Sequence, residues 1–279
     1  AGKRHELLER VKAIRERIPS IRTVVVCSYT GREPVVLADQ TAWEDFLGGS
    51  EDPPTFDRRP FDHPLAILYT SGTTGVPKCI VHGAGGTLLK HLEEHVLQVD
   101  LHREDVFFYF TTCGWMMWNW LASGLAIGAT VVLYDGSPLH PDPGRLFRMI
   151  DRDGITIFGT SPRFLSTVGS SGIVPREEFS LATLRTVLST GSPLHPAQFE
   201  WVYRSVKADV MLSSISGGTD LIGCFVCGSP LHPVRAGEIP CRALGMKVES
   251  LDEDGRPVVG KKGELVCSAP FPSMPVRFW

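Results

Sequence analysis

The chain has 279 residues, of which 43% are hydrophobic and 21% charged, a composition typical of a globular protein with at least one large core. Its 28 Lys and Arg residues nearly balance 31 Asp and Glu residues. The net charge of −3 therefore provides no long-range field that would favour nucleic acid or an anionic membrane. We expect a small-molecule partner.

The cysteines and the N-terminal residues indicate the compartment. Seven cysteines, an odd number at irregular spacing, lie mostly in apolar runs, as buried thiols in a reducing compartment do. The first 18 residues form a charged amphipathic helix pattern without the features of a signal peptide. We expect a cytoplasmic protein. Because the chain starts without Met and ends in an aromatic run, we also expect a segment of a longer protein.

Apolar strand-like runs alternate with helix patterns along most of the chain. Strands are predicted over residues 65–70, 106–110, 130–134, 155–160, 183–190 and 210–216, with helices over 86–99, 116–127, 145–152, 163–170 and 196–206. Such alternation predicts an α/β fold, with right-handed βαβ units and a mostly parallel sheet covered by helices on both faces. Ligands of such sheets bind at the carboxyl ends of the strands.

Residues 106–134 contain no charge, so a hydropathy window would score much of the segment as a membrane span. Turn residues nevertheless divide it into a strand, a buried helix and a second strand. Covered parallel sheets produce such apolar strands routinely, so we favour the globular interpretation.

Beyond residue 231 the pattern changes. Apolar and polar residues alternate around an Asp-Glu-Asp-Gly turn, which predicts antiparallel strands of a small β subdomain.

The strongest local signal is the run from Tyr69 to Lys78, YTSGTTGVPK, directly after an apolar strand. Backbone N–H groups and hydroxyls of such a loop can surround a polyphosphate, while Lys78 supplies a point charge. It is not a Walker A loop, which has Gly-Lys followed by Ser or Thr at a different spacing. We interpret it as a phosphate-binding loop rather than a flexible linker.

The hexapeptide GSPLHP occurs at residues 136–141, 191–196 and 228–233, each time after a strand-like run. Unequal intervals exclude a solenoid period. We interpret the copies as strand-exit turns in which Pro ends the ladder, and the middle copy is also a candidate ligand contact.

Residues 69–78 resemble the signature phosphate loop of the adenylate-forming superfamily, which includes acyl-CoA synthetases, luciferases and peptide-synthetase adenylation domains. The resemblance covers residues 2–279 and is most specific to acetoacetyl-CoA synthetases, through the stretches FYFTTCGWMMWNW and SSISGGTDLIG. It implies that residues 1–62 belong to a preceding α/β subdomain and an irregular connection. Residues 63–232 would then form the ATP-binding subdomain, and residues 233–279 part of a β-barrel subdomain.

The resemblance implies an AMP-forming ligase that uses ATP, Mg²⁺ and coenzyme A. A short carboxylic acid, acetoacetate, would be converted to an acyl-adenylate and transferred to the thiol. The ribose-binding Asp motif, the hinge and the C-terminal catalytic domain of such enzymes would follow residue 279, so we expect the isolated segment to bind ligands but to be inactive.

Site residues are implied position by position. The ATP phosphates are assigned to Thr70, Ser71, Gly72, Thr73, Thr74, Gly75 and Lys78, and the adenine to Gly191, Ser192 and Pro193 on one side and Ser214, Ile215 and Ser216 on the other. Thr219 and Asp220 match the hydroxyl and carboxylate that meet the phosphate and its Mg²⁺. With Lys78 they are the expected catalytic residues, and Asp220 is the expected metal ligand, an Asp where most of the superfamily has Glu.

The same resemblance assigns the acyl group to Trp115, Met116, Gly217 and Gly218. Acetyl-specific relatives have Trp at the position of Gly217, so a glycine there leaves room for an acid longer than acetate, and another short acid stays open. Trp118 and Trp120 lie at helical spacings from Trp115 and are candidates for core packing.

Three alternatives remain. His91 and His95 fit the H-x-x-E-H pattern of a zinc peptidase, although we expect this charged amphipathic helix to present them to solvent. Cys224 and Cys227 could suggest zinc or redox chemistry, but without a second Cys pair at zinc spacing we expect buried strand thiols. The third alternative is a non-catalytic nucleotide-binding protein.

Overall fold

The computed structural model describes residues 7–27, 40–49, 51–70 and 75–279. The chain divides into two compact units, Ala1–Arg58 and Arg59–Trp279, and each is described by itself. The described elements of the first unit are helix α1 (Leu8–Arg17), the parallel strands β1 (Val25–Val26) and β2 (Thr41–Ala42), and helix α2 (Trp43–Leu47).

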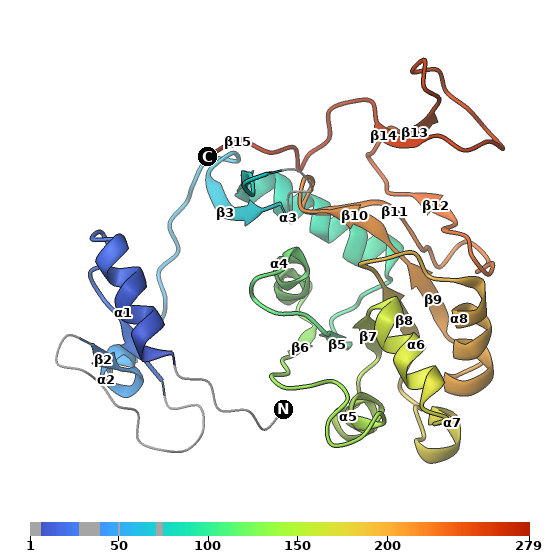
Figure 1. Cartoon of the computed structure of the whole chain (residues 1–279), viewed down its shortest axis with the longest axis horizontal. Helices are drawn as coiled ribbons and strands as arrows, with labels where there is room; N and C mark the ends of the chain where they lie inside the picture. Colours follow the sequence, from blue (N-terminus) through green and yellow to red (C-terminus); the bar gives the residue numbers. More distant parts are fainter. Residues whose placement is uncertain (1–6, 28–39, 50, 71–74) are drawn as a thin grey trace. The chain divides into compact units, whose positions relative to one another are not determined.

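The second unit is built around a five-stranded parallel sheet with the order β6-β5-β7-β8-β9 (Figure 1). The strands are β5 (Val106–Tyr109), β6 (Thr130–Val132), β7 (Ile157–Thr160), β8 (Thr186–Ser189) and β9 (Met211–Ser214). All four pairings between neighbours are parallel. The predicted α/β fold with a mostly parallel sheet is confirmed.

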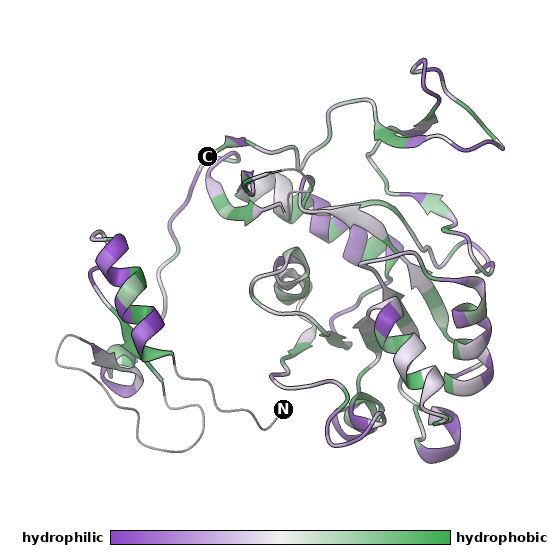
Figure 2. Ribbon diagram, viewed as in Figure 1, coloured by the Kyte–Doolittle hydropathy of each residue, from purple (hydrophilic) through white to green (hydrophobic). Residues whose placement is uncertain are grey.

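Helices cover both faces of this sheet. They are α4 (Met116–Ser123), α5 (Arg145–Asp153), α6 (Pro162–Ser170), α7 (Pro175–Glu178) and α8 (Pro196–Trp201), with a 3₁₀ turn η2 (Gly124–Ala126) after α4 and a π-helix η3 (Val202–Val206) after α8. Around α5, hydrophobic and hydrophilic residues alternate, as expected of a helix with one buried face (Figure 2).

Alternate residues of each strand enter two different cores. Phe108 of β5 and Phe158 of β7 pack in the cluster that contains buried residues of α5, α6 and α8. Their neighbours Phe107 and Ile157 pack with α4. Because successive strand side chains point to opposite faces, each strand contributes to both cores, which explains why these strands are apolar throughout.

The uncharged segment 106–134 forms β5, α4 and β6 rather than a continuous helix. Among the described residues, no helix has the length and apolar character needed to cross a bilayer.

The strand predicted over residues 65–70 exists, but it lies outside the parallel sheet. Strand β3 (Pro64–Tyr69) does not lead directly to a helix but pairs antiparallel with a second strand, β4 (Cys79–Gly83). These two strands and β15 (Arg277–Phe278) form a separate sheet with the order β15-β4-β3. Helix α3 (Ala84–Glu93) begins only after β4 and continues as a π-helix, η1 (Glu94–Gln98). The sequence pattern missed β4 because a five-residue apolar run joined directly to a helix resembles the first turn of that helix.

Antiparallel pairing begins before residue 231, earlier in the chain than predicted. Strands β10 (Ser216–Gly218) and β11 (Gly223–Cys227), which the alternating pattern did not indicate, form one antiparallel sheet with β12 (Cys241–Arg242). The antiparallel strands predicted beyond residue 231 are confirmed by a further pair. Strands β13 (Val248–Leu251) and β14 (Glu264–Cys267) form a two-stranded sheet.

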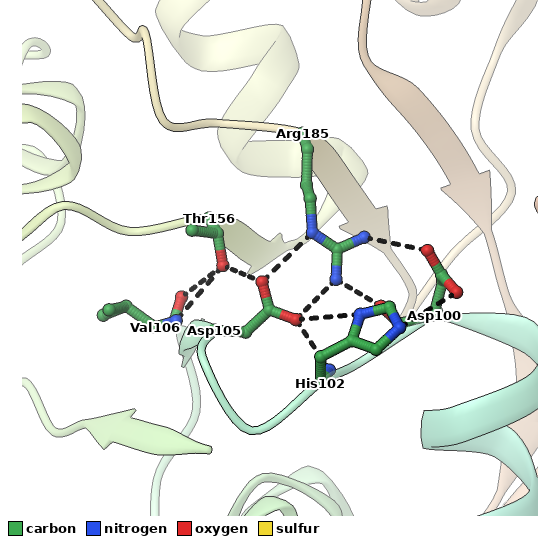
Figure 3. Close-up of polar contacts among 6 residues, drawn as sticks. All are labelled: Asp100, His102, Asp105, Val106, Thr156 and Arg185. Atoms are coloured by element: carbon green, nitrogen blue, oxygen red, sulfur yellow. Dashed lines mark hydrogen bonds and ion pairs between the residues drawn. The ribbon is translucent and has the colours of Figure 1, made fainter.

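A polar network around the buried Asp105 carboxylate joins three strands at the amino edge of the parallel sheet (Figure 3). Arg185, just before β8, donates from Nε to Oδ1 of Asp105 over 3.1 Å and from Nη2 to Oδ2 over 2.5 Å. The hydroxyl of Thr156, just before β7, donates to Asp105 Oδ1 over 2.7 Å. Burial alone would raise the pKa of Asp105, but the bonds from Arg185, the His102 N–H and Thr156 together lower it. The carboxylate therefore stays charged and fixes the starts of β5, β7 and β8.

Candidate functional site

A cavity of about 720 Å³ lies at the carboxyl ends of β5, β7, β8 and β9, the edge where ligands of parallel sheets bind. Its lining residues are Leu68, Tyr69, Thr70, Pro77, Glu94, Gln98, Val99, Tyr109, Phe110, Gly114, Trp115, Met116, Met117, Trp120, Thr160, Ser161, Thr190, Gly191, Ser213, Ile215, Gly217, Gly218, Thr219, Gly223, Cys224 and Cys227. This volume is within the range of small-molecule sites.

The cavity brings together residues that the sequence analysis selected from distant segments. Of the predicted site residues, Thr70, Trp115, Met116, Gly191, Ile215, Gly217, Gly218 and Thr219 line it. Gly75, Lys78, Ser192, Pro193, Ser214, Ser216 and Asp220 are described but do not line it. Ser71, Gly72, Thr73 and Thr74 lie outside the described residues.

The predicted phosphate loop connects β3 to β4 as a hairpin. Its two ends are joined by the Thr70 N–H, which donates to the Lys78 carbonyl over 3.0 Å, and by the Lys78 N–H, which donates to Oγ1 of Thr70 over 3.1 Å. The Lys78 side chain is exposed, while Thr70 lines the cavity. The base of the hairpin therefore has Thr70 at the cavity wall and, paired with it, Lys78 with an exposed cationic side chain.

The middle GSPLHP copy forms the turn between β8 and α8. Gly191 has φ +98°, a backbone conformation that favours glycine. The preceding residue, Thr190, donates from Oγ1 to the Ile215 carbonyl over 2.7 Å and from its N–H to the Thr160 carbonyl over 3.3 Å. These bonds join the exits of β7, β8 and β9. His195, in the same copy, caps helix α8 by accepting from the Ala197 N–H. All three copies follow a strand, as predicted.

The turn that carries Thr219 connects β10 to β11, and buried histidines hold it. His82, on β4, donates from Nε2 to the Thr219 carbonyl over 2.8 Å. His91, on α3, donates from Nε2 to the Ile222 carbonyl over 2.6 Å. Both rings are at most 1% exposed. Two neutral side chains thus fix both ends of a turn whose first residue lines the cavity.

A hydroxyl holds the middle of the same turn. The Ser273 Oγ donates to the Leu221 carbonyl over 2.6 Å. Ile222 has φ +50°, which is uncommon for a β-branched residue. The surrounding bonds oppose relaxation of that strained residue, so the turn has a defined shape.

Burial lowers the pKa of His82 and His91, and that of His95 to about 3, so all three rings are neutral near pH 7. His95 uses Nε2 toward the Trp120 carbonyl, 2.9 Å away. Since each Nε2–H donates to a carbonyl, each Nδ1 is the unprotonated nitrogen of the ring.

The prediction that this helix presents His91 and His95 to solvent was wrong. Its polar face, with Lys90, His91, Glu94 and His95, is at most 2% exposed, whereas Leu88, Leu89, Val96 and Leu97 are 44–53% exposed. The amphipathic pattern was real, but the polar side faces the interior. Among the described residues, no group of three His, Cys, Asp or Glu side chains is placed to hold a metal.

Sequence analysis missed Glu94 as a cavity residue. Its Oε1 accepts from the Cys224 N–H over 2.7 Å, and its Oε2 accepts from the Trp120 indole N–H over 2.7 Å. Lys90 Nζ lies 3.1 Å from Oε1. Burial alone would lower the pKa of Lys90, but the nearby Glu94 and Glu93 raise it, so Lys90 stays protonated. The i, i+4 spacing of Lys90 and Glu94 was the available signal.

Trp120 of α4 is buried in the core with Phe107 and Tyr109 of β5, the packing role for which it was a candidate. Cys224 and Cys227 are buried on β11, as predicted.

Gly217 has a second reason to be glycine. A β-carbon there would lie 2.1 Å from the Gly223 carbonyl oxygen, on the paired strand β11. At Gly218, the nearest atom would be Asp220 Oδ2 at 3.9 Å. The close approach of β10 and β11 therefore requires glycine at position 217, whatever its effect on cavity size.

Asp220 is exposed beside Thr219 and has no hydrogen-bond partner among the described residues. Mg²⁺ is commonly held by one or two carboxylates together with substrate phosphates and water. One exposed carboxylate next to a hydroxyl residue of the cavity fits that requirement.

A parallel α/β sheet with a ligand-sized cavity at its carboxyl edge defines a small-molecule-binding α/β protein. The chain matches the family of AMP-binding enzymes over residues 3–274, and it belongs to this family.

The relatives agree with this assignment. The chain is 50% identical over 282 residues to an acetoacetyl-coenzyme A synthetase of Rhizobium meliloti (strain 1021), with 100% of this chain and 43% of that protein covered. It is 43% identical to malonamoyl-CoA synthetase vrtB of Penicillium aethiopicum, over 95% of this chain and 40% of that protein. The solved acetoacetyl-CoA synthetase of Streptomyces lividans is 41% identical, with a TM-score of 0.93, over 100% of this chain and 43% of that one. The chain thus spans under half the length of these proteins.

Proposed function

We propose that the protein carrying this chain is an AMP-forming acid–thiol ligase that activates acetoacetate with ATP and transfers the acyl group to coenzyme A. The observation that carries the proposal is the convergence of Thr70, Gly191 and Thr219, from three separate segments, on one cavity of about 720 Å³. We take acetoacetate as the acid because similar proteins are named acetoacetyl-CoA synthetases.

The first half-reaction would need little proton transfer. A carboxylate oxygen of the acid attacks the α-phosphorus of ATP, and pyrophosphate leaves. Cations and backbone dipoles that neutralise the pentavalent phosphorus are then most of the catalysis. We assign Thr70, Ser71, Gly72, Thr73, Thr74, Gly75 and Lys78 to the phosphates.

Thr219 and Asp220 complete the proposed phosphate site. The hydroxyl of Thr219 would donate to phosphate oxygen, and the Asp220 carboxylate would ligate Mg²⁺, which supplies positive charge to the phosphates when bound. Because the Thr219 carbonyl is fixed by His82, 2.8 Å away, its backbone is held in place before ligand binding. In the second half-reaction, the thiol of coenzyme A would attack the acyl carbon and AMP would leave.

The adenine and acyl assignments use the remaining cavity residues. Gly191 and Ile215 would lie on two sides of the adenine, with Ser192, Pro193, Ser214 and Ser216 as their neighbours in the chain. Trp115, Met116, Gly217 and Gly218 would contact the acyl group.

For domain organisation we propose residues 1–62 as part of a preceding subdomain, residues 63–232 as the ATP-binding subdomain and residues 233–279 as part of a β subdomain. Catalysis would need the full-length protein, while this chain alone would bind ATP. We also propose a cytoplasmic protein with small-molecule partners. All seven cysteines are free thiols, as a reducing compartment would keep them, although only Cys224 and Cys227 are buried, fewer than expected from the sequence.

The test is acid-dependent exchange of pyrophosphate into ATP with the full-length protein. Acetoacetate, acetate, butyrate and a no-acid control are compared. Exchange driven best by acetoacetate supports both the reaction class and the acid. Exchange driven best by another acid keeps the ligase and rejects acetoacetate. ATP binding without exchange for any acid would favour a non-catalytic nucleotide-binding protein.

A further inference from the structure

Three thiols gather where strand β11 pairs with β12. Cys224 and Cys227 of β11 are each 3% exposed, and both line the cavity. A bulge between Cys224 and Val226 adds one residue to β11, so two cysteines three positions apart face the same side. Cys241, on β12, is the register partner of Cys227 and is partly exposed. The thiol cluster therefore extends from the cavity wall to solvent.

The register places Cys227 and Cys241 within reach of a disulfide bond. Facing residues of an antiparallel ladder have Cα atoms about 4.5–5.5 Å apart, which lies inside the range of about 4.4–6.8 Å found for disulfides. The Cys241 Sγ already lies 3.2 Å from the Cys227 carbonyl oxygen. The Cys224 thiol is engaged elsewhere, because it donates to Glu94 Oε1 over 3.1 Å. The strand pairing thus selects Cys227 and Cys241 from the three.

The two facing thiols differ in their reactivity. A hydrogen bond with the Cys227 thiol, assisted by one from the Gln98 amide, lowers the pKa of Cys241 against the effect of burial. The pKa of Cys227 is raised by its bonds with the two neighbouring thiols and by burial. Cys241 is therefore the thiol that an oxidant meets as a thiolate, with Cys227 as a buried thiol beside it.

A bound metal does not account for the thiol cluster. Across the described part of the chain, no three His, Cys, Asp or Glu side chains are placed to hold a metal ion. In reducing compartments, disulfides are transient and serve catalysis or redox sensing. A pair of facing thiols, one of them accessible and reactive, has the arrangement that redox sensing needs.

We propose that Cys241 and Cys227 form a reversible disulfide when the protein meets a peroxide, and that this bond changes the wall of the cavity. The Cys241 sulfur attacks one oxygen of hydrogen peroxide, the O–O bond breaks, and hydroxide leaves and takes a proton from solvent. The Cys227 sulfur then attacks the sulfenic sulfur of Cys241, so that an S–S bond forms and the S–O bond breaks. The hydroxyl group and the Cys227 thiol proton leave as water. Dithiothreitol reverses the step and is itself oxidised.

The disulfide alters residues that line the cavity. Cys227 turns toward β12, and the Cys241 Sγ gives up its contact with Gln98 Nε2, 3.7 Å away. Movement of β11 is passed to β10, because the two strands approach so closely that only glycine fits at position 217. Oxidation therefore weakens binding in the cavity. This consequence rests on the proposed function when it is measured as pyrophosphate exchange, whereas formation of the disulfide does not.

The experiment treats the full-length protein with a small molar excess of hydrogen peroxide. Remaining thiols are blocked with iodoacetamide, and peptides are compared by mass spectrometry with and without dithiothreitol. We expect linked peptides that contain Cys227 and Cys241 and that separate on reduction. Pyrophosphate exchange with acetoacetate falls on the order of tenfold on oxidation and returns on reduction, since misplacing a substrate by about 1 Å costs up to about 10²-fold.

Substitutions separate the roles of the two thiols. Cys241→Ser removes the reactive thiol, so no link forms and exchange survives peroxide. In Cys227→Ser, the sulfenic acid on Cys241 has lost the thiol that faces it and is labelled by dimedone. Cys267→Ser is the matched control, because Cys267 is also a partly exposed strand thiol but faces Val248 across the β13–β14 pair. It keeps both the link and the loss of exchange.

The outcomes distinguish this proposal from the proposed function. Complete alkylation of Cys227 and Cys241 after peroxide treatment overturns the disulfide and leaves the ligase standing, as does a link between Cys224 and Cys227 with Cys241 free. A Cys227–Cys241 link that leaves exchange unchanged overturns the effect on the cavity. If the untreated protein exchanges pyrophosphate with no acid, the proposed function fails, while the linked peptides still decide whether the disulfide forms.

Discussion

His82 Nε2 donates to the Thr219 carbonyl over 2.8 Å, across 137 positions of sequence. This bond connects β4 to the turn between β10 and β11, so a buried neutral histidine sets the backbone beside the proposed phosphate site. Removing the donor should leave the Thr219 carbonyl unsatisfied and the turn less ordered. We expect His82→Leu to raise the KM for ATP by about tenfold, with a smaller change in kcat.

His82→Gln is the conservative control, because an amide nitrogen can take the place of Nε2–H. It should restore most of the lost ATP affinity in the same exchange assay. Equal KM values for His82→Leu and wild type would contradict a positioning role.

The buried ion pair of Lys90 and Glu94 should be costly to break on one side. Lys90→Met removes the cation and leaves Glu94, 2% exposed, as a buried charge. We expect a loss of about 3–5 kcal/mol in the free energy of unfolding, measured by urea denaturation. The double variant Lys90→Met/Glu94→Gln should recover a large part of that loss, because no buried charge then remains. If the loss in the double variant equalled the sum of the losses from the two single substitutions, the two side chains would not be directly paired.

Acid should destabilise the fold through its buried histidines. In the unfolded chain their pKa returns to about 6.5, whereas burial lowers the pKa of His95 in the folded state to about 3. Below pH 6.5 the unfolded state therefore binds more protons, and stability falls as pH decreases from 6.5 toward 3. Well inside this window His95 contributes a slope of about 1.4 kcal/mol per pH unit.

His95→Gln should weaken the pH dependence of the free energy of unfolding, measured with urea between pH 7 and pH 5. At the acid end of this range, unfolding of the variant should take up about one proton fewer than unfolding of wild type. His102→Gln is the matched control, since the His102 side chain is 59% exposed. Identical slopes for His95→Gln and wild type would show that His95 does not stay neutral in the folded chain.

The Asp105–Arg185 network should contribute stability without affecting ligand binding. It lies at the amino edge of the sheet, while the cavity lies at the carboxyl edge. Arg185→Met leaves Asp105, 6% exposed, without its guanidinium and should reduce the free energy of unfolding by about 2–4 kcal/mol. ATP binding by the folded variant, measured by calorimetry, should stay within about twofold of wild type.

Arg148→Met provides the comparison for an exposed pair. Arg148 lies 3.2 Å from Asp142, and both side chains are more than 40% exposed. Its replacement should cost at most about 1 kcal/mol. Similar losses for the two Arg variants would mean that burial of the Asp105 network adds nothing.

Gly217 and Gly218 should differ sharply in their tolerance of a methyl group. Gly217→Ala places a β-carbon 2.1 Å from the Gly223 carbonyl oxygen, so β10 must move away from β11. We expect a loss of at least about 2 kcal/mol in the free energy of unfolding. Gly218→Ala meets its nearest atom at 3.9 Å and should cost less than about 1 kcal/mol. Thermal and urea unfolding of both variants check this, and a tolerated Gly217→Ala would argue against the close strand pairing.

Sequence alone determined the parallel sheet and the position of the proposed phosphate loop after a strand. The strands β5 to β9 are short apolar runs bounded by turn residues, and that information is contained within each run. The turn at Gly191 was also evident from a Gly-Ser-Pro run after a strand, but its φ of +98° was not, since Gly228 in the third copy is not among the positive-φ glycines. The sequence pattern did not predict strand β4, because its five residues join helix α3 without a turn.

Only the tertiary structure decided which face of α3 and η1 is buried. A 3.6-residue pattern identifies two faces but not the one that packs inward, and the usual preference for an apolar interior gave the wrong answer. The choice depends on partners far away in the chain: His91 bonds Ile222 across 131 positions, and Glu94 bonds Cys224 across 130. Buried polar groups are stable only where such partners exist, so Glu94 and Gln98 could be recognised as cavity residues only once the fold had brought η1 against β11 and β12.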